Sequence, residues 1–152
     1  MYFLNKSKLS IFKNDIGDLN TDGIEFSYNQ ENSKFFISHL NSKKIDVVQL
    51  RRPNWSLGFM HTKELENNFS ITTNYKYKGR HLDVHNSNWS TITMPETHLL
   101  DLNLGYNYYG IDFGVSLLNL FDENYESPHG FSQEGRKFTL GFNKSFWRLI
   151  ST

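Results

Sequence analysis

Apolar and polar residues alternate in three segments of the last third of the chain, between Glu96 and Trp147. A period of two residues is typical of a β-strand with one apolar face and one wet face. The apolar positions are Leu100, Leu102, Leu104, Tyr106, Tyr108, Ile111, Phe113, Val115, Leu117, Phe138, Leu140, Phe142 and Phe146. The pattern predicts three strands, near residues 100–108, 111–117 and 137–146.

The first two-thirds of the chain predict four further strands. Alternation places them at residues 9–28, 34–42, 53–59 and 69–77, although Phe35-Phe36-Ile37 interrupts the alternation of the second. Pro53 opens the third, a position where its missing N–H matters least. Residues 1–4 are interpreted as the end of a strand, residues 5–8 as a turn and residues 79–95 as a long polar loop. The sequence thus predicts seven strands and an N-terminal stub.

Connections of two lengths join these strands. Short turns near residues 31, 66 and 109 fall at one end of a meander, and long loops near 46, 88 and 128 fall at the other. Strands of about 9–13 residues, with short turns at one end and long loops at the other, are typical of an outer-membrane barrel. We therefore expect an all-β fold, an antiparallel transmembrane β-barrel segment of about seven to eight meander strands.

A soluble antiparallel barrel or sandwich, such as a lipocalin-like fold, would explain the alternation equally well. Two features of the sequence count against it. The polar face carries many Asn, Ser, Thr and Lys residues, and aromatic residues such as Tyr77, Tyr108 and Phe121 gather at strand ends. Amphipathic rings at strand ends are typical of a membrane interface.

Composition excludes several classes of function. The formal net charge is +0 and no basic patch stands out, so we expect no nucleic-acid partner. Cysteine is absent, which excludes a disulfide scaffold, a thiolate nucleophile and a zinc–cysteine site. Aromatic residues make up 16% of the chain while mean hydropathy is −0.57, which suits a barrel with a wet lumen and an apolar outer surface.

The sequence contains no run of ~18 apolar residues, the length of a membrane helix. Its start, Met1-Tyr2-Phe3-Leu4, also lacks the charged and apolar regions of a signal peptide. An outer-membrane protein needs such a signal, so either the barrel interpretation is wrong or this chain is a piece of a longer one.

Residues with candidate chemistry are concentrated in the long loops. His81, Asp83 and His85 alternate, and in an extended loop they would point the same way, as metal ligands do. We prefer a polar surface loop with solvated histidines and no metal. Ser127, His129 and Asp122 share a loop without the spacing of a catalytic triad, so we expect neither an enzyme nor a cofactor. Ligand contacts are expected from loops 41–52, 80–96 and 122–134, at His81, Asp83, His85, Asn86, Trp89, Tyr125, His129 and Phe131.

Four motifs, in order along the chain, resemble those of TonB-dependent outer-membrane receptors. Asn14-Asp15-Ile16-Gly17 with Asp22-Gly23-Ile24-Glu25 comes first, and Arg51-Arg52-Pro53 follows. The segment from Leu118 to Glu126 is similar to the family's last loop, and Gly135-Arg136-Lys137-Phe138 with Phe146 is similar to its final strand. The loop lengths most resemble the vitamin B12 (cobalamin) receptor branch. The motif residues, for which we expect structural roles, are Gly17, Gly23, Glu25, Arg52, Asn119, Leu120, Phe121, Tyr125, Gly135, Arg136 and Phe146.

The resemblance implies a barrel of roughly 22 strands with a plug inside it. Residues 1–147 would be the C-terminal part of that barrel and residues 148–152 a short tail. The implied function is uptake of a cobalamin-like corrinoid or an iron chelate across the outer membrane. The implied partners are outer-membrane lipid, the nutrient, TonB through the missing N-terminal part, and the barrel assembly machinery, which reads the last strand at Phe146.

A small stand-alone outer-membrane barrel, acting as a pore or a structural protein, is the alternative. An isolated seven-strand piece would leave its first and last strands unpaired, which lipid cannot satisfy. We therefore expect the chain alone to form an open, curved sheet.

Overall fold

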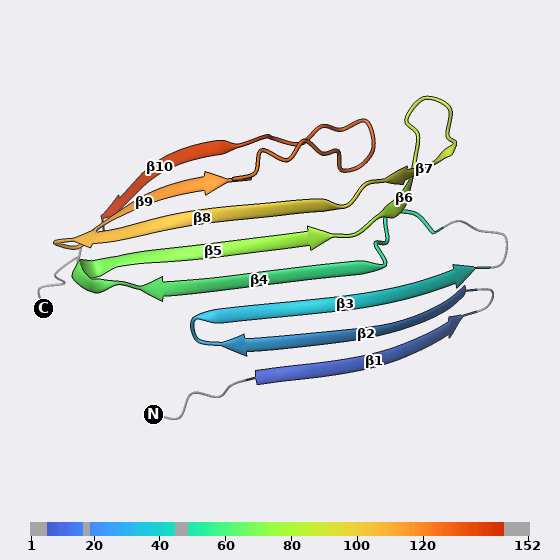
Figure 1. The fold of residues 1–152 in the computed structure, drawn as a ribbon, viewed down its shortest axis with the longest axis horizontal. Helices are drawn as coiled ribbons and strands as arrows, with labels where there is room; N and C mark the ends of the chain where they lie inside the picture. Colours follow the sequence, from blue (N-terminus) through green and yellow to red (C-terminus); the bar gives the residue numbers. More distant parts are fainter. Residues whose placement is uncertain (1–5, 17–18, 45–48, 145–152) are drawn as a thin grey trace, which may run out of the picture.

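The computed structural model describes residues 6–16, 19–44 and 49–144. Each strand in this part of the chain is antiparallel to the strands beside it. Eight strands form one meander in the order β1-β2-β3-β4-β5-β8-β9-β10, and β6 pairs with β7 in a separate hairpin (Figure 1). The predicted all-β, antiparallel fold is confirmed. The elements are β1 (Lys6–Ile16), β2 (Leu19–Gln30), β3 (Ser33–Lys44), β4 (Trp55–Glu64), the 3-10 turn η1 (Glu66–Asn68), β5 (Phe69–Lys78), β6 (His81–Val84), β7 (Thr91–Met94), β8 (Thr97–Tyr108), β9 (Ile111–Leu118) and β10 (Lys137–Lys144).

The N-terminal strands differ from the prediction. The single run predicted at residues 9–28 is two strands, β1 and β2, which pair from Lys6 opposite Asn29 to Ile16 opposite Leu19. Lys6 to Lys8 therefore lie in β1 and not in a turn. Only residues 17–18 separate the two strands, so no polar loop marked the hairpin in the sequence. The predicted stub at residues 1–4 lies outside the described residues.

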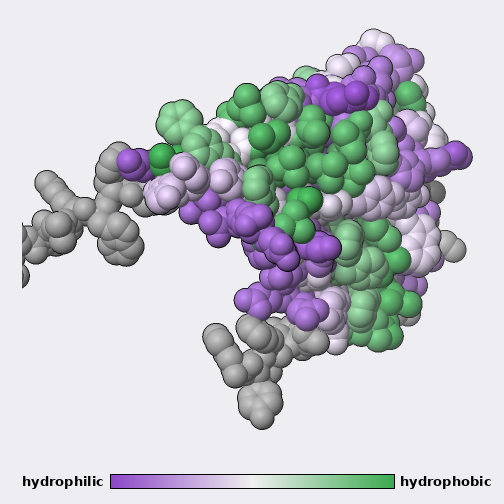
Figure 2. Space-filling view, turned by 60° about the vertical axis from the view of Figure 1, so that its left-hand side comes forward, coloured by the Kyte–Doolittle hydropathy of each residue, from purple (hydrophilic) through white to green (hydrophobic). Residues whose placement is uncertain are grey.

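One face of the sheet is apolar across all eight strands. The register places Leu57 opposite both Ile37 and Tyr77, and the same parity continues from strand to strand. Figure 2 shows apolar side chains gathered in a broad patch, with hydrophilic ones at its margins. Within the described side chains Met94 is the only buried hydrophobic one, while Phe142 is 80% exposed and Ile11 74% exposed. The sheet thus presents its apolar side chains outward instead of packing them into a core.

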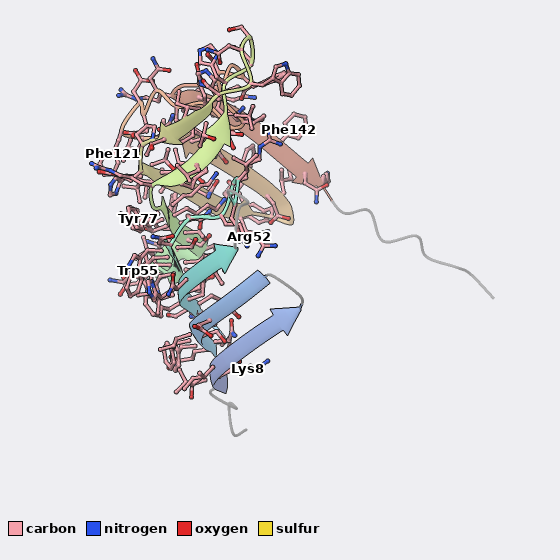
Figure 3. The ribbon with its side chains drawn as sticks, turned by 90° about the vertical axis from the view of Figure 1, so that its right-hand side faces the viewer. Lys8, Arg52, Trp55, Tyr77, Phe121 and Phe142 are labelled. Carbon is pink, nitrogen blue, oxygen red and sulfur yellow. The ribbon has the colours of Figure 1, made fainter. Side chains whose placement is uncertain are left out.

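The opposite face is polar and lies on the inside of the curve. Trp55 and Tyr77 point outward from the curved sheet, whereas Arg52 and Lys8 lie on its inner side (Figure 3). Phe36 is an exception, because its ring lies over Gly58 on the inner face, where any Cβ would collide with it. This placement explains why Phe35-Phe36-Ile37 interrupts the alternation: Phe35 and Ile37 keep the apolar parity, and Phe36 fills the space left by a glycine.

The short turns after β2, β4 and β8 lie at one end of the strands and the long loops at the other, as predicted (Figure 1). The two-residue connection between β1 and β2 is an exception, because the pairing of Leu19 with Ile16 and with Lys44 puts it at the long-loop end. At the turn end, Tyr109 and Gly110 have φ of 47° and 75°, the pair of positive angles that a type I′ two-residue hairpin turn requires. Asn67 and Asn68 also have positive φ, which Asn tolerates better than most residues. Turn chemistry therefore sets the register that keeps the apolar parity aligned.

The sheet is open, because β1 and β10 each pair with one neighbour and not with each other. The predicted open, curved sheet is confirmed, and its eight strands agree with the predicted seven to eight. No helix long and apolar enough to span a membrane occurs in the described part of the chain.

Candidate functional site

Three segments meet at the long-loop end of the sheet, and we call them together the loop cap: residues 49–54, 81–94 and 119–136 (Figure 1). The second corrects the prediction of a polar loop at residues 79–95, because it contains the β6–β7 hairpin. That hairpin pairs from His81 opposite Met94 to Val84 opposite Thr91. Its strands have four residues each, too few to show as alternation in a polar stretch.

Asp83 joins all three segments of the loop cap. Its side chain is 0% exposed, and Oδ1 accepts a hydrogen bond from Arg51 Nε at 2.8 Å and from the Val84 N–H at 2.8 Å. Oδ2 accepts from the His129 N–H at 3.0 Å. Each carboxylate oxygen is therefore satisfied, as burial of a charge demands. One side chain thus holds loop 49–54, strand β6 and loop 119–136 together.

The backbone supports the same junction. Leu50 forms a parallel bridge with Leu82, and the Arg51 N–H donates to the Leu82 carbonyl at 2.6 Å. Because the Arg51 side chain and its N–H both bind β6, Arg51 holds this loop at two points. The sequence drew attention to its neighbour Arg52, and no local signal distinguished Arg51.

Burial and hydrogen bonding shift the pKa values of two groups in the loop cap. Burial by itself would raise the pKa of the Asp83 carboxyl, but the N–H groups of His129 and Val84, together with Arg51, lower it to about 2. Burial lowers the pKa of His81, aided by the nearby Lys78 ammonium. Asp83 is therefore ionised and His81 neutral at neutral pH.

His81, Asp83 and His85 do not act as one set of ligands. His81 is 7% exposed and its Nδ1 lies 3.2 Å from the Gly79 carbonyl, so the expectation that it is solvated was wrong. Asp83 faces Arg51, and His85 Nδ1 lies 3.0 Å from Ser87 Oγ. The described residues contain no group of three or more His, Cys, Asp or Glu side chains placed to hold a metal ion.

Several predicted ligand-facing residues come together between the hairpin and the last loop. The rings of His85 and His129 have centroids 4.8 Å apart, and Asn86 packs against Gly130, where a Cβ would collide with its amide. His129 Nδ1 lies 2.8 Å from Glu126 Oε2, which also accepts from the Gly130 N–H at 2.7 Å. Glu126 is a contact that the sequence interpretation did not single out. Contact of these residues with a ligand remains a prediction.

The remaining predicted ligand-facing residues are Tyr125, Trp89 and Phe131. Tyr125 lines a cavity of about 290 Å³ together with His129, Met94 and Pro95. Trp89 is 81% exposed in the connection between β6 and β7, and Phe131 is 63% exposed in the last loop. The Trp89 and Phe131 rings are therefore open to solvent, and neither residue is among the hydrogen-bond partners of Asp83.

The motif around Asn119 has a structural role that the geometry makes explicit. Asn119 is 6% exposed with φ of 49°; its amide donates to the Glu123 carbonyl at 2.9 Å and accepts from the Glu123 N–H at 2.9 Å. The Asn119 N–H donates to Asp101 Oδ1 at 2.9 Å, and the Leu120 N–H donates to the Leu100 carbonyl at 2.7 Å. Asn119 therefore ends β9 and shapes the loop that follows.

The other motif residues have varied positions. Asp122 Oδ1 accepts from the Arg136 N–H at 2.7 Å and closes the base of the loop beside Gly135, while Phe121 is 59% exposed on the outer side (Figure 3). Gly23 and Glu25 lie in β2, and Arg52 lines a cavity described below. Gly17 and Phe146 lie outside the described residues, as does the predicted tail at 148–152.

Comparison with known proteins finds likeness of fold. No family model and no curated protein matches the chain. Among solved structures, FpvAI in complex with pyocin S2 matches with a TM-score of 0.65 and 16% identity, over 82% of this chain and 19% of that one. P. aeruginosa FpvA bound to a heterologous pyoverdine and iron matches with the same values. The chain therefore spans about a fifth of the length of these proteins, and its curved antiparallel sheet has the fold of one part of them.

Proposed function

We propose that this chain is the C-terminal part of the β-barrel of a TonB-dependent outer-membrane receptor, and that the receptor takes up an iron chelate. In this proposal the chain's role is binding and transport, not catalysis. Residues 1–147 supply barrel wall and extracellular loops, while a plug and the TonB contact belong to sequence that precedes them.

The observation that carries the proposal is the two-faced open sheet. Its apolar face is exposed across eight strands, including Leu140 at 68% and Phe138 at 58%, which suits contact with lipid and not with water. The unpaired edges at β1 and β10 need further strands, because lipid offers no hydrogen bonds to a free edge. Both features support a segment of a larger barrel.

One observation favours an iron chelate as the cargo. The motifs at Asn119-Leu120-Phe121 and Gly135-Arg136 resemble cobalamin, siderophore and haem receptors alike and do not distinguish the cargo, whereas FpvA is bound to pyoverdine and iron in one structure that this fold matches. The expected cobalamin-like corrinoid gains no support from the comparisons. We therefore place the iron chelate first and retain the corrinoid as the competing cargo in the experiment.

A stand-alone barrel is the second candidate, and the open edges count against it. Closure of these eight strands would need β1 to pair with β10, whereas each has one partner. A soluble β-protein is also disfavoured, since the apolar face is uncovered. A purified 152-residue chain that forms a closed barrel in detergent would support the stand-alone barrel. A chain that stays monomeric without detergent would support the soluble β-protein.

The test begins with the DNA upstream of the Met1 codon. We expect an open reading frame, in phase, that encodes more antiparallel strands and a plug. Cells that carry the product of that frame in the outer membrane should take up radioactive iron supplied as ferric chelates, and only when TonB is present. Uptake of radioactive cyanocobalamin instead of iron would contradict the proposal that the cargo is an iron chelate. A promoter directly before Met1 would contradict the proposal that the chain is part of a longer receptor.

A further inference from the structure

A cavity of about 280 Å³ opens between the β3–β4 loop and the β6–β7 hairpin, and we call it the Arg52 cavity. It lies at the long-loop end of the sheet, and Arg52 points to the inner side of the curve (Figure 3). Its lining is Leu40, Gln49, Arg52, Asn54, Arg80, His81, Leu82 and Thr93. Ligand cavities are commonly ~300–1,000 Å³, so this one suits a small molecule or one end of a larger one.

The lining of the Arg52 cavity is cationic. Among the residues that the structure describes, it contains two guanidinium groups and no carboxylate. Arg80 forms a bidentate ion pair with Glu96 outside the cavity lining, which raises the pKa of Arg80 and lowers that of Glu96. Arg52 has no ion pair or hydrogen bond among the described residues, unlike its neighbour Arg51, which is held by Asp83. An uncommitted guanidinium remains, with the geometry to bind a carboxylate through two parallel hydrogen bonds.

A second group in the lining lacks a partner. Gln49 Oε1 is buried and, within the described part of the chain, accepts no hydrogen bond. A buried acceptor without a donor is unusual in folded proteins and is often explained by a ligand or a bound water. The cavity thus joins a free donor of charge-assisted hydrogen bonds to an acceptor that needs an O–H or N–H.

We propose that the Arg52 cavity binds a small hydroxycarboxylate, or the hydroxycarboxylate end of an iron chelate. Arg52 binds the carboxylate, and the ligand hydroxyl donates to Gln49 Oε1. Because His81 is neutral, it can form a further hydrogen bond with the ligand, and it does not compete with Arg52 for the carboxylate. The inference rests on the proposed function in naming the substrate class, but binding at the cavity is measured apart from transport.

The test uses the product of the complete reading frame that encodes this chain, purified in detergent. Calorimetric titration compares citrate with tricarballylate, which has the same three carboxylates and no hydroxyl; a third titration uses ferric citrate to separate the free acid from the chelate. We expect citrate to bind more tightly than tricarballylate. Arg52→Gln should weaken citrate binding about 10-fold or more, since a charge-assisted hydrogen bond is lost. Gln49→Leu should remove the preference for citrate over tricarballylate.

Lys34→Gln is the matched control, because it removes one positive charge from the inner face at the opposite end of β3. Citrate affinity should not change in this variant, and Arg52→Lys should recover part of the affinity lost in Arg52→Gln. Far-UV circular dichroism checks that each variant keeps its strands. Absence of citrate binding, equal effects of R52Q and K34Q, or a citrate preference that persists in Q49L would each overturn the proposal.

The two proposals can fail separately. Arg52-dependent citrate binding without transport of iron would support the proposed binding site and contradict the proposed iron uptake. Transport of a ferric chelate that is unaffected by R52Q, with no citrate binding, would support the uptake and overturn the cavity.

Discussion

The eight-stranded sheet and the loop cap are held together in different ways. In the sheet, each residue's face follows from its own parity, and neighbouring strands are joined by short turns such as Tyr109-Gly110. In the loop cap, the decisive contacts are few, polar and distant in sequence, and most meet at Asp83. We therefore expect the sheet to tolerate most single changes, with Gly58 under the Phe36 ring as an exception, whereas the loop cap depends on individual side chains.

Removal of the Asp83 carboxylate should have the largest effect on the loop cap. Asp83→Ala leaves the His129 N–H and the Arg51 guanidinium without their acceptor, which we expect to lower the free energy of opening the cap by about 2–3 kcal/mol. Hydrogen exchange at Arg51 and His129 measures this opening. The strands β4 and β5 should keep their protection.

Glu96→Gln is the matched control for Asp83→Ala, since it removes one carboxylate from an exposed ion pair with Arg80 in the same region. It should leave exchange at Arg51 and His129 unchanged. Equal acceleration of exchange in both variants would mean that net charge, and not the Asp83 junction, holds the loops.

Acidification should open the loop cap in a defined range of pH. The pKa of Asp83 is about 2 in the folded protein against an ordinary value of 3.8, so the ionised carboxylate stabilises the closed cap fully above about pH 4. That stabilisation is lost as the pH falls from about 4 through 2. Pepsin cleavage between residues 119 and 136 reports the opening, and the ratio of cleavage rates to an Asp83→Asn variant removes the pH dependence of pepsin itself. A ratio that stays constant from pH 5 to about 2 would contradict the assignment.

Loss of the Asn119 amide should affect one segment of the cap and leave the Asp83 junction intact. Asn119→Ala removes two hydrogen bonds with Glu123 and places alanine at positive φ, which together should cost roughly 1–3 kcal/mol of local stability. Exchange at the Glu123 amide measures it. Asn119→Asp keeps the acceptor for that amide and tolerates positive φ, so it should lose less; an equal loss would assign the effect to the hydrogen bond that the Asn119 amide donates to the Glu123 carbonyl.

The sequence predicted the sheet well because its information is local. Leu57 and Phe59 identify the apolar face by alternation alone, and short turns then fix how strands align. The errors arose where this local signal was missing: the β1–β2 hairpin has a connection of two residues, and β6 and β7 are four residues each. The cluster of His81, Asp83 and His85 was found, but its role was not. Asp83 is joined to Arg51 at a separation of 32 residues and to His129 at 46, and no alternation encodes such pairs.

Substitution of a turn glycine should have the smallest effect, and it tests whether turns set the register of the sheet. Gly110 has φ of 75°, so Gly110→Ala should lower stability by roughly 1 kcal/mol, measured as the midpoint of urea unfolding in detergent. Gly114→Ala is the matched control, because an added Cβ meets nothing within 4 Å and its position lies within β9. Alanine is preferred to glycine in a strand, so Gly114→Ala should be neutral or slightly stabilising. If Gly114→Ala destabilised the protein more than Gly110→Ala, packing on the inner face would limit the sheet more than turn geometry does, and the contrast between a tolerant sheet and a sensitive loop cap would no longer hold.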